Sequence, residues 1–101
     1  KFLGKILQGL PAKELRGLVD EGKKQIDSGV VVFIGIDEGK VGIAVGVTKD
    51  LTERFDAVSL VRLGADKLGG KGGGGRPDMA QAGGSNTDAA PEALDAIKAS
   101  L

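Results

Sequence analysis

The sequence contains no cysteine, no histidine, no tryptophan and no tyrosine. Without cysteine or histidine, the chain has no disulfide, no thiol nucleophile, no imidazole base and almost none of the usual zinc ligands. Phenylalanine is the only aromatic residue and occurs three times, so the core must be built from Val, Ile, Leu and Ala. The composition therefore argues against thiol and imidazole catalysis and against nearly every zinc site.

Long apolar runs and a surplus of charge of one sign are also lacking. No segment approaches the ~18 apolar residues that a membrane-spanning helix needs, and the formal net charge is zero. At 101 residues with 41% hydrophobic content, residues 1–101 fit one domain with a modest core. The first residue is not Met, so we expect a piece excised from a longer multidomain chain. The absence of cysteine is compatible with a cytoplasmic location.

Apolar patterning predicts three strands and one helix in the first half of the chain. Residues 2–7 are expected to form an edge strand, and residues 12–27 a helix that ends at a Gly C-cap. The β-branched run 30–36 is typical of a strand buried on both faces. Residues 41–47 alternate between large and small side chains, which predicts an antiparallel hairpin with the preceding run. The small face of this strand, Gly42, Ala44 and Gly46, favours close packing of a helix.

The second half predicts two more helices. Asp56 is a candidate N-cap for a helix over residues 57–68, and Asn86 offers a cap for a last helix over residues 89–101. Residues 79–82 could add a short strand. The expected order is β-α-β-β-α-(β)-α, which describes a small α/β (α+β) domain with helices packed on a mixed sheet.

The organising segment is residues 69–84, which holds eight of the 18 glycines. Because glycine loses much backbone entropy in a regular helix or strand, we expect an irregular loop whose backbone can approach a ligand. The Walker A pattern of a nucleotide-binding P-loop is not matched, because no Ser or Thr follows Lys71, and a dinucleotide fingerprint would follow a strand rather than a helix. Both mismatches argue against a nucleotide pocket. A lone carboxylate, Asp78, is a poor basis for catalysis. It is better interpreted as a structural acceptor that pairs with Arg76 or with loop N–H groups.

Positive charge gathers on and just before this segment. Residues 62–76 contain Arg62, Lys67, Lys71 and Arg76 against the single acidic residue Asp66. Cations beside an adaptable main chain suit the phosphates of a nucleic-acid backbone, recognised by shape as in structured RNA. The alternative is that the glycines only let the loop fold tightly against the sheet. The residues alone do not decide between these two interpretations.

Residues 69–84, GGKGGGGRPDMAQAGG, resemble the signature near the C-terminus of alanyl-tRNA synthetases. Residues 45–52, VGVTKDLT, and residues 15–20, LRGLVD, are similar to the same C-terminal domain, so the resemblance covers essentially the whole chain. Related domains attached to DHH-type phosphoesterases typically carry a His in the glycine motif. This chain has none, which favours the synthetase branch.

The resemblance implies a non-catalytic domain that binds the outer corner, or elbow, of alanine-specific tRNA. The domain would thereby link aminoacylation and editing, and ATP, magnesium and zinc would belong only to the rest of the parent ligase. The motif residues that carry over as binding candidates are Gly72, Gly73, Gly74, Gly75, Arg76 and Gln81, to which local charge adds Lys71, Lys67 and Arg62. Structural roles within the motif fall to Pro77, Asp78, Met79, Gly83 and Gly84.

Two other functions stay open at this point. The domain could be a structural module that packs against other domains of the parent chain or against a second copy in a homodimer. The parent could also be a stand-alone deacylase that edits mischarged tRNA, because such proteins carry a similar C-terminal domain.

Overall fold

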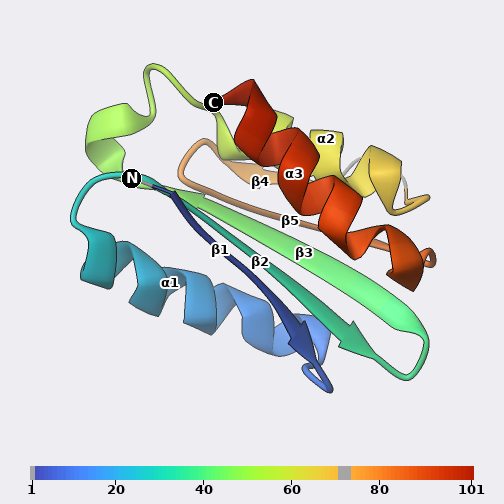
Figure 1. Cartoon of the computed structure of the whole chain (residues 1–101). Coiled ribbons are helices and arrows are strands. Elements are labelled where there is room, and N and C mark those ends of the chain that lie inside the picture. Colours follow the sequence, from blue (N-terminus) through green and yellow to red (C-terminus); the bar gives the residue numbers. More distant parts are fainter. Residues whose placement is uncertain (1, 71–73) are drawn as a thin grey trace.

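The computed structural model describes residues 2–70 and 74–101, which form five strands and three α-helices (Figure 1). The elements are β1 (Phe2–Gln8), α1 (Leu15–Ile26), β2 (Val30–Asp37), β3 (Lys40–Val47), α2 (Ala57–Lys67), β4 (Gly74–Arg76), β5 (Met79–Gly84) and α3 (Ala90–Ser100). Short 3-10 turns lie at Ala12–Glu14, Lys49–Leu51 and Thr87–Ala89. The predicted mixed α/β fold is confirmed.

The strands form one sheet in the order β1-β2-β3-β5-β4. β1 lies at one edge and pairs with β2 in parallel, and α1 makes the crossover between them. The other pairs are antiparallel, and β2 and β3 form the predicted hairpin. The short strand β4 is the opposite edge.

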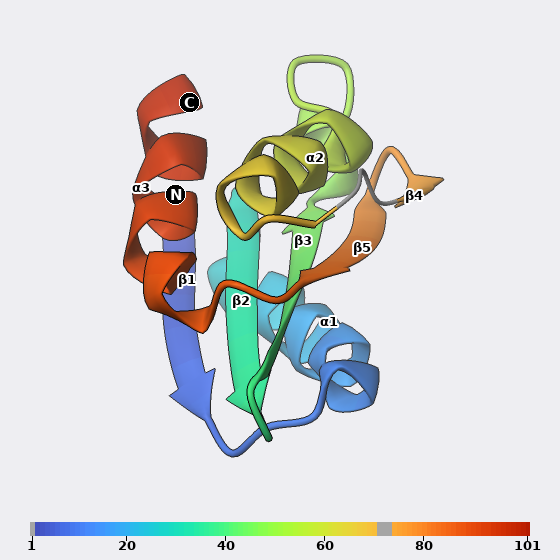
Figure 2. The ribbon, with the colours of Figure 1, turned by 90° about the vertical axis from the view of Figure 1, so that its right-hand side faces the viewer.

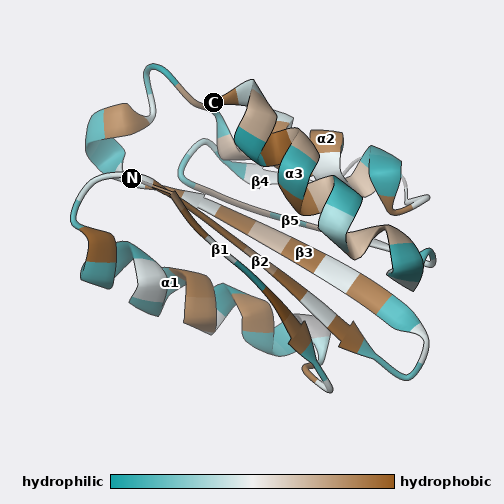
Figure 3. Ribbon diagram, viewed as in Figure 1, coloured by the Kyte–Doolittle hydropathy of each residue, from teal (hydrophilic) through white to brown (hydrophobic). Residues whose placement is uncertain are grey.

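The sheet separates two layers of helices (Figure 2). α1 covers one face, while α2 and α3 cover the other. Apolar residues recur along the strands and the helices (Figure 3), and the buried ones form two core clusters. The large side chains of β3 belong to the core cluster under α2 and α3, namely Val41, Ile43, Val45 and Val47. Ala44 belongs to the second cluster, which contains Leu15 and Val19 of α1. The alternation in the sequence therefore assigned both faces of β3 correctly.

Close approach of α1 to the sheet depends on a glycine of β3. A Cβ added at Gly46 would overlap with Val19 Cγ1 and lie 2.8 Å from Lys23 Cδ. The prediction that the small-residue face receives a tightly packed helix is thus confirmed. The stem of Lys23 lies across the same glycine, which directs its amino group towards the far edge of the sheet.

The glycine-rich segment corrects one expectation, because its described part is not irregular. Residues 74–76 and 79–84 form a β-hairpin whose second strand pairs with β3, for example Gln81 with Ala44. Hydrogen bonding to an already formed sheet edge offsets the entropy that glycine loses in a strand. Gly70 also packs against this strand, where an added Cβ would overlap with the carbonyl oxygen of Gly83.

The ends of α1 and α3 differ from the sequence prediction. Residues 12–14 form a 3-10 turn, which is common at helix N-termini, so α1 begins at Leu15. Before α3, the Asn86 side chain makes no cap hydrogen bond, and the backbone carbonyl of Asn86 instead accepts from Ala89 N–H at 3.2 Å. The predicted helix over residues 89–101 is one residue too long at its C-terminal end, because α3 ends at Ser100 and Leu101 is 41% exposed rather than part of the core. The Asp56 cap is confirmed, since its carboxylate accepts from Val58 N–H at 3.0 Å. None of the described helices is long and apolar enough to cross a membrane.

The packing at Gly70 predicts a position-specific response to a single methyl group. Gly70→Ala forces a Cβ into the carbonyl of Gly83, and we expect it to lower the free energy of unfolding by about 1–3 kcal/mol. Gly17→Ala is the matched control, because Gly17 lies in α1 with nothing within 4 Å. That change should stabilise the domain by up to about 1 kcal/mol through helix propensity. Urea denaturation measures both, and equal effects of the two substitutions would contradict this account of Gly70.

Candidate nucleic-acid interface

The tip of the β4–β5 hairpin is fixed by the elements beside it. Pro77 and Asp78 form its two-residue turn. The carbonyl of Pro77 accepts from Ala57 N–H at 2.9 Å, and the carbonyl of Asp78 accepts from Val47 N–H at 2.9 Å. The tip is therefore anchored to the start of α2 and to the end of β3. Side chains carried by this hairpin are held in defined positions rather than on a free loop.

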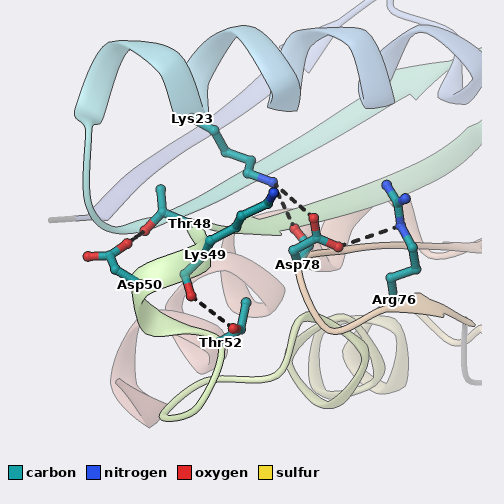
Figure 4. Close-up of polar contacts among 7 residues, drawn as sticks. All are labelled: Lys23, Thr48, Lys49, Asp50, Thr52, Arg76 and Asp78. Atoms are coloured by element: carbon teal, nitrogen blue, oxygen red, sulfur yellow. Dashed lines mark hydrogen bonds and ion pairs between the residues drawn. The ribbon is translucent and has the colours of Figure 1, made fainter.

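An ion cluster surrounds Asp78 (Figure 4). Its carboxylate lies 3.5 Å from Arg76 Nε and 3.7 Å from Lys23 Nζ, and Lys23 Nζ also donates to the Asp78 carbonyl at 3.2 Å. The ion pair with Arg76 is the one expected from the sequence, whereas Lys23 was not anticipated. Lys23 and Asp78 are 17% and 26% exposed, but the Arg76 side chain is 66% exposed. An external anion can therefore reach the Arg76 guanidinium.

A cavity lies between this hairpin and α1. It has a volume of about 270 Å³ and is lined by Arg16, Gly74, Gly75, Arg76, Met79, Ala80 and Gln81. Arg76 pairs with the buried Met79, and Gln81 pairs with Ala44, so both polar side chains lie on the α1 side of the sheet. Arg16 reaches the same cavity from α1. Two guanidinium groups, an amide and exposed glycine backbone suit an anionic oxygen ligand.

Two neighbouring cavities continue along α1. One, of about 300 Å³, is lined by Lys13, Leu15, Ile43, Gln81 and Ala82. The other, of about 380 Å³, is lined by Asp20, Lys23, Lys24, Thr48 and Lys49. Gln81 lines both the first of these and the Arg16 cavity. The three cavities together place cations along the whole length of one side of α1.

A small hydrogen-bond network fixes the loop at one end of these cavities. The buried hydroxyl of Thr48 accepts from Gly29 N–H at 3.0 Å and donates to an Asp50 oxygen at 2.5 Å. Ser28 Oγ donates to the other Asp50 oxygen. The bonds from Ser28 and Thr48 hold the pKa of Asp50 below its ordinary value of 3.8. Their stabilising contribution is therefore complete above that value and is lost as the pH falls through the lowered pKa.

Among the described residues, the structure places the binding residues predicted from the sequence on two opposite faces of the sheet. Arg76 and Gln81 lie together on the α1 side, and Gly74 is exposed with nothing within 4 Å of an added Cβ. Arg62 and Lys67 are exposed on α2, which covers the opposite face of the sheet. Three of the candidates, Lys71, Gly72 and Gly73, lie outside the described residues.

The remaining motif residues have packing roles. Met79 is buried in the cluster under α1, and a Cβ added at Gly84 would overlap with the carbonyl of Leu68. A Cβ at Gly75 would likewise overlap with the Met79 carbonyl, so this binding candidate also has a structural requirement for glycine. Gly83 is exposed, and its added Cβ would lie 3.5 Å from the Val41 carbonyl. In the part of the chain that the structure describes, no group of three or more Asp or Glu residues could hold a metal ion.

Sequence reasoning missed the cations of α1. Arg16 and Lys23 are seven residues apart, so helical spacing alone places them on one side of α1. The spacing alone did not show which edge of the sheet this side of α1 faces. The right-handed rule for a parallel β-α-β crossover was the available signal, because it limits where α1 can lie relative to β1 and β2.

Comparison with known proteins gives a consistent result over the whole chain. The family model described as the DHHA1 domain matches residues 1–101. The chain is 61% identical over 100 residues to the alanine–tRNA ligase of Hyphomonas neptunium and 60% identical over 102 residues to that of Parvibaculum lavamentivorans. The matches cover 99–100% of this chain, but the chain spans only 11% of the length of each ligase.

Solved structures agree with the sequence matches. The crystal structure of the C-Ala domain from Aquifex aeolicus alanyl-tRNA synthetase superposes with a TM-score of 0.89 at 31% identity, covering 97% of this chain and 87% of that one. A DHH-domain protein described as a member of a family of ribosomal proteins has a TM-score of 0.55 at 21% identity, over 90% of this chain and 21% of that one. The second likeness concerns the fold alone.

The ion cluster predicts measurable coupling between α1 and the hairpin. In a double-mutant cycle of Lys23→Met and Asp78→Asn, we expect a coupling free energy of about 0.5–1 kcal/mol, as for partly exposed ion pairs. The coupling should shrink in 1 M salt. Lys24→Met, at an exposed position next in the helix, is the control and should show no coupling to Asp78. Urea denaturation supplies the free energies, and zero coupling at low salt would contradict the ion pair.

Proposed function

The chain belongs to the DHHA1 domain family, and from that membership we propose that it is the tRNA-binding C-terminal domain of an alanine–tRNA ligase. Support comes from relatives of that name at up to 61% identity and from the likeness to a C-Ala domain over 87% of that domain. In this proposal the domain itself is non-catalytic. The rest of the ligase, in the cytoplasm, carries the chemistry with its ATP, magnesium and zinc.

The observation that carries the proposal is the anchored hairpin that presents Arg76 and Gln81 beside Arg16. Positively charged donors at fixed positions suit phosphate oxygens, which supply most of the affinity in nucleic-acid binding. No aromatic side chain is among the described residues that line the three cavities along α1. The proposed mode is therefore recognition of a folded RNA backbone, without stacking of bases on aromatic rings.

The finer part of the proposal concerns where on the tRNA the domain binds. The elbow of tRNA presents a folded backbone rather than a single-stranded sequence, which matches the cationic but aromatic-free surface. A domain that holds the elbow of alanine-specific tRNA would keep the RNA attached between aminoacylation and editing. We propose this linking role for the intact ligase, whose other domains would contact the same RNA.

Direct binding of tRNA tests the proposed function. We expect the 101-residue chain to bind alanine-specific tRNA, with an affinity that falls as salt rises. The double substitution of Lys71→Ala and Arg76→Ala should weaken binding further and reduce the slope of log K against log salt by about one to two. Lys98→Ala, at an exposed site on α3, is the control. Fluorescence anisotropy at several salt concentrations gives both quantities, and wild-type affinity of the double variant would remove these two residues from the interface.

A second candidate function is favoured by the exposed apolar side chain of Leu63 on the α2 side. Leu63 is exposed and lines a cavity of about 360 Å³ with Arg54, Phe55, Asp56, Ser59, Leu60 and Ser100. Such a surface suits packing against another domain of the parent chain or a second copy. If this were the function, sedimentation would show self-association that Leu63→Ser abolishes, while anisotropy would show no binding of tRNA. The residues that precede this chain in the parent would separate a ligase from a stand-alone editing deacylase.

A further inference from the structure

Resting on the proposed tRNA-binding function, we infer that the RNA backbone lies along α1, with Arg16 and Arg76 binding the same phosphate from opposite walls. We call this surface the α1 groove. It consists of three cavities along α1, which face the β4–β5 hairpin, the strands β3 and β5, and the segment after β3. Its polar residues are Lys13, Arg16, Asp20, Lys23, Lys24, Thr48, Lys49, Arg76 and Gln81. Nothing in the glycine motif itself points to α1.

The central cavity of the groove is lined by hydrogen-bond donors from both walls. Arg16 comes from α1 and Arg76 from β4, yet both line the same space of about 270 Å³. Gly74 leaves its backbone uncovered at this wall, because no atom lies within 4 Å of an added Cβ. Two guanidinium groups facing one cavity can each bind a phosphate through two parallel N–H donors. Arg16 thus supplies the second guanidinium group of a site to which the hairpin contributes Arg76.

The cations on either side of this cavity extend the site along one strand of backbone. Lys13 lies beyond it in one direction, and Lys23, Lys24 and Lys49 lie in the other. Arg16 and Lys23 are separated by two helical turns, or about 10 Å, which spans a few consecutive phosphates. The acidic residue that lines the groove is Asp20. The nearby carboxylate of Asp78 is already paired with Lys23 and Arg76.

The two layers of helices carry a similar balance of exposed charge. Over residues 13–27 the exposed cations are Lys13, Arg16 and Lys24, and the exposed carboxylates are Glu14, Asp20, Glu21 and Asp27. Among the described residues from the start of α2 to the end of α3, excluding the hairpin, the exposed cations are Arg62, Lys67 and Lys98, and the exposed carboxylates are Asp66, Asp88, Glu92 and Asp95.

The two sides differ in how their cavities are lined. The cavities along α1 are lined by one carboxylate, Asp20, and by six cations, namely Lys13, Arg16, Lys23, Lys24, Lys49 and Arg76, whereas the cavity on the α2 side is lined by Arg54 and Asp56. This placement of cations favours the α1 side for the RNA and leaves Arg62 and Lys67 outside the contact.

Both walls of the groove are set before any ligand arrives. The hairpin tip is tied to Ala57 and Val47 through backbone hydrogen bonds, and α1 is seated on Gly46. Lys23 joins the two walls through Asp78. A preformed surface avoids the cost of ordering flexible segments on binding. Removing one cation should consequently change the affinity without changing the fold.

Single substitutions on the two faces test the inference with the 101-residue chain and alanine-specific tRNA. Arg16→Ala should weaken binding about tenfold, as expected for loss of a charge-assisted phosphate contact, and should lower the salt slope by about one. Arg16→Lys should restore part of the affinity, because it keeps the charge but loses the planar fork. Lys98→Ala and Arg62→Ala are the matched controls on the other face and should bind as wild type. Circular dichroism melting checks that each variant is folded.

A double substitution tests whether Arg16 and Arg76 share one phosphate. If they do, the effect of Arg16→Ala with Arg76→Ala should be smaller than the product of the two single effects. The inference is overturned if the wild type binds tRNA but Arg16→Ala behaves like Lys98→Ala, or if Arg62→Ala weakens binding more than Arg16→Ala. Those outcomes leave the proposed function standing. Absence of any tRNA binding by the folded wild-type chain would overturn the proposed function and the inference together.

Discussion

The contact between Val19 of α1 and Gly46 of β3 sets the distance between the helix and the sheet, and the rest of the α1 face depends on it. With any side chain at position 46, Val19 and the stem of Lys23 would have to move away from the sheet. The ion pair of Lys23 with Asp78 and the cavity shared by Arg16 and Arg76 both lie between this helix and the sheet edge, so both depend on that distance. A packing constraint in the core thus determines the arrangement of charges at the surface.

The glycines of residues 69–84 serve different purposes although they are adjacent in sequence. Gly70 and Gly84 let backbone segments pack against each other, because an added Cβ at either would overlap with a carbonyl group. Gly74 has open space around it and leaves backbone uncovered at the cavity. The two interpretations of the segment are therefore compatible, because Gly70 and Gly84 account for tight folding while Gly74 stays open to the proposed contact with a ligand.

Most of the fold was predictable because its strands and helices have clear periodic patterns. The alternation over residues 41–47 gave both faces of β3, and the Asp56 cap gave the start of α2. The pairing of β4 with β5 was not predictable, because glycine has no side chain to contribute to a pattern and the sheet edge supplies the stability. Arg76 and Gln81 followed from the motif, whereas Arg16 required knowledge of which side of α1 faces the hairpin. That is a property of the packed sheet, and the local sequence around residue 16 does not contain it.

The contact of α3 with β1 joins the last helix to the first strand. A Cβ added at Gly4 would lie 2.7 Å from Leu94 Cδ1, and Ile97 is fully buried in the cluster that Phe2 and Ile6 also border. During synthesis from the N-terminus, β1 and β2 can pair around α1 while the face that α3 will cover is still open to water. The core closes only after Leu94 and Ile97 have left the ribosome. Until then the nascent domain exposes apolar strands, so the final helix decides when the domain is protected from aggregation.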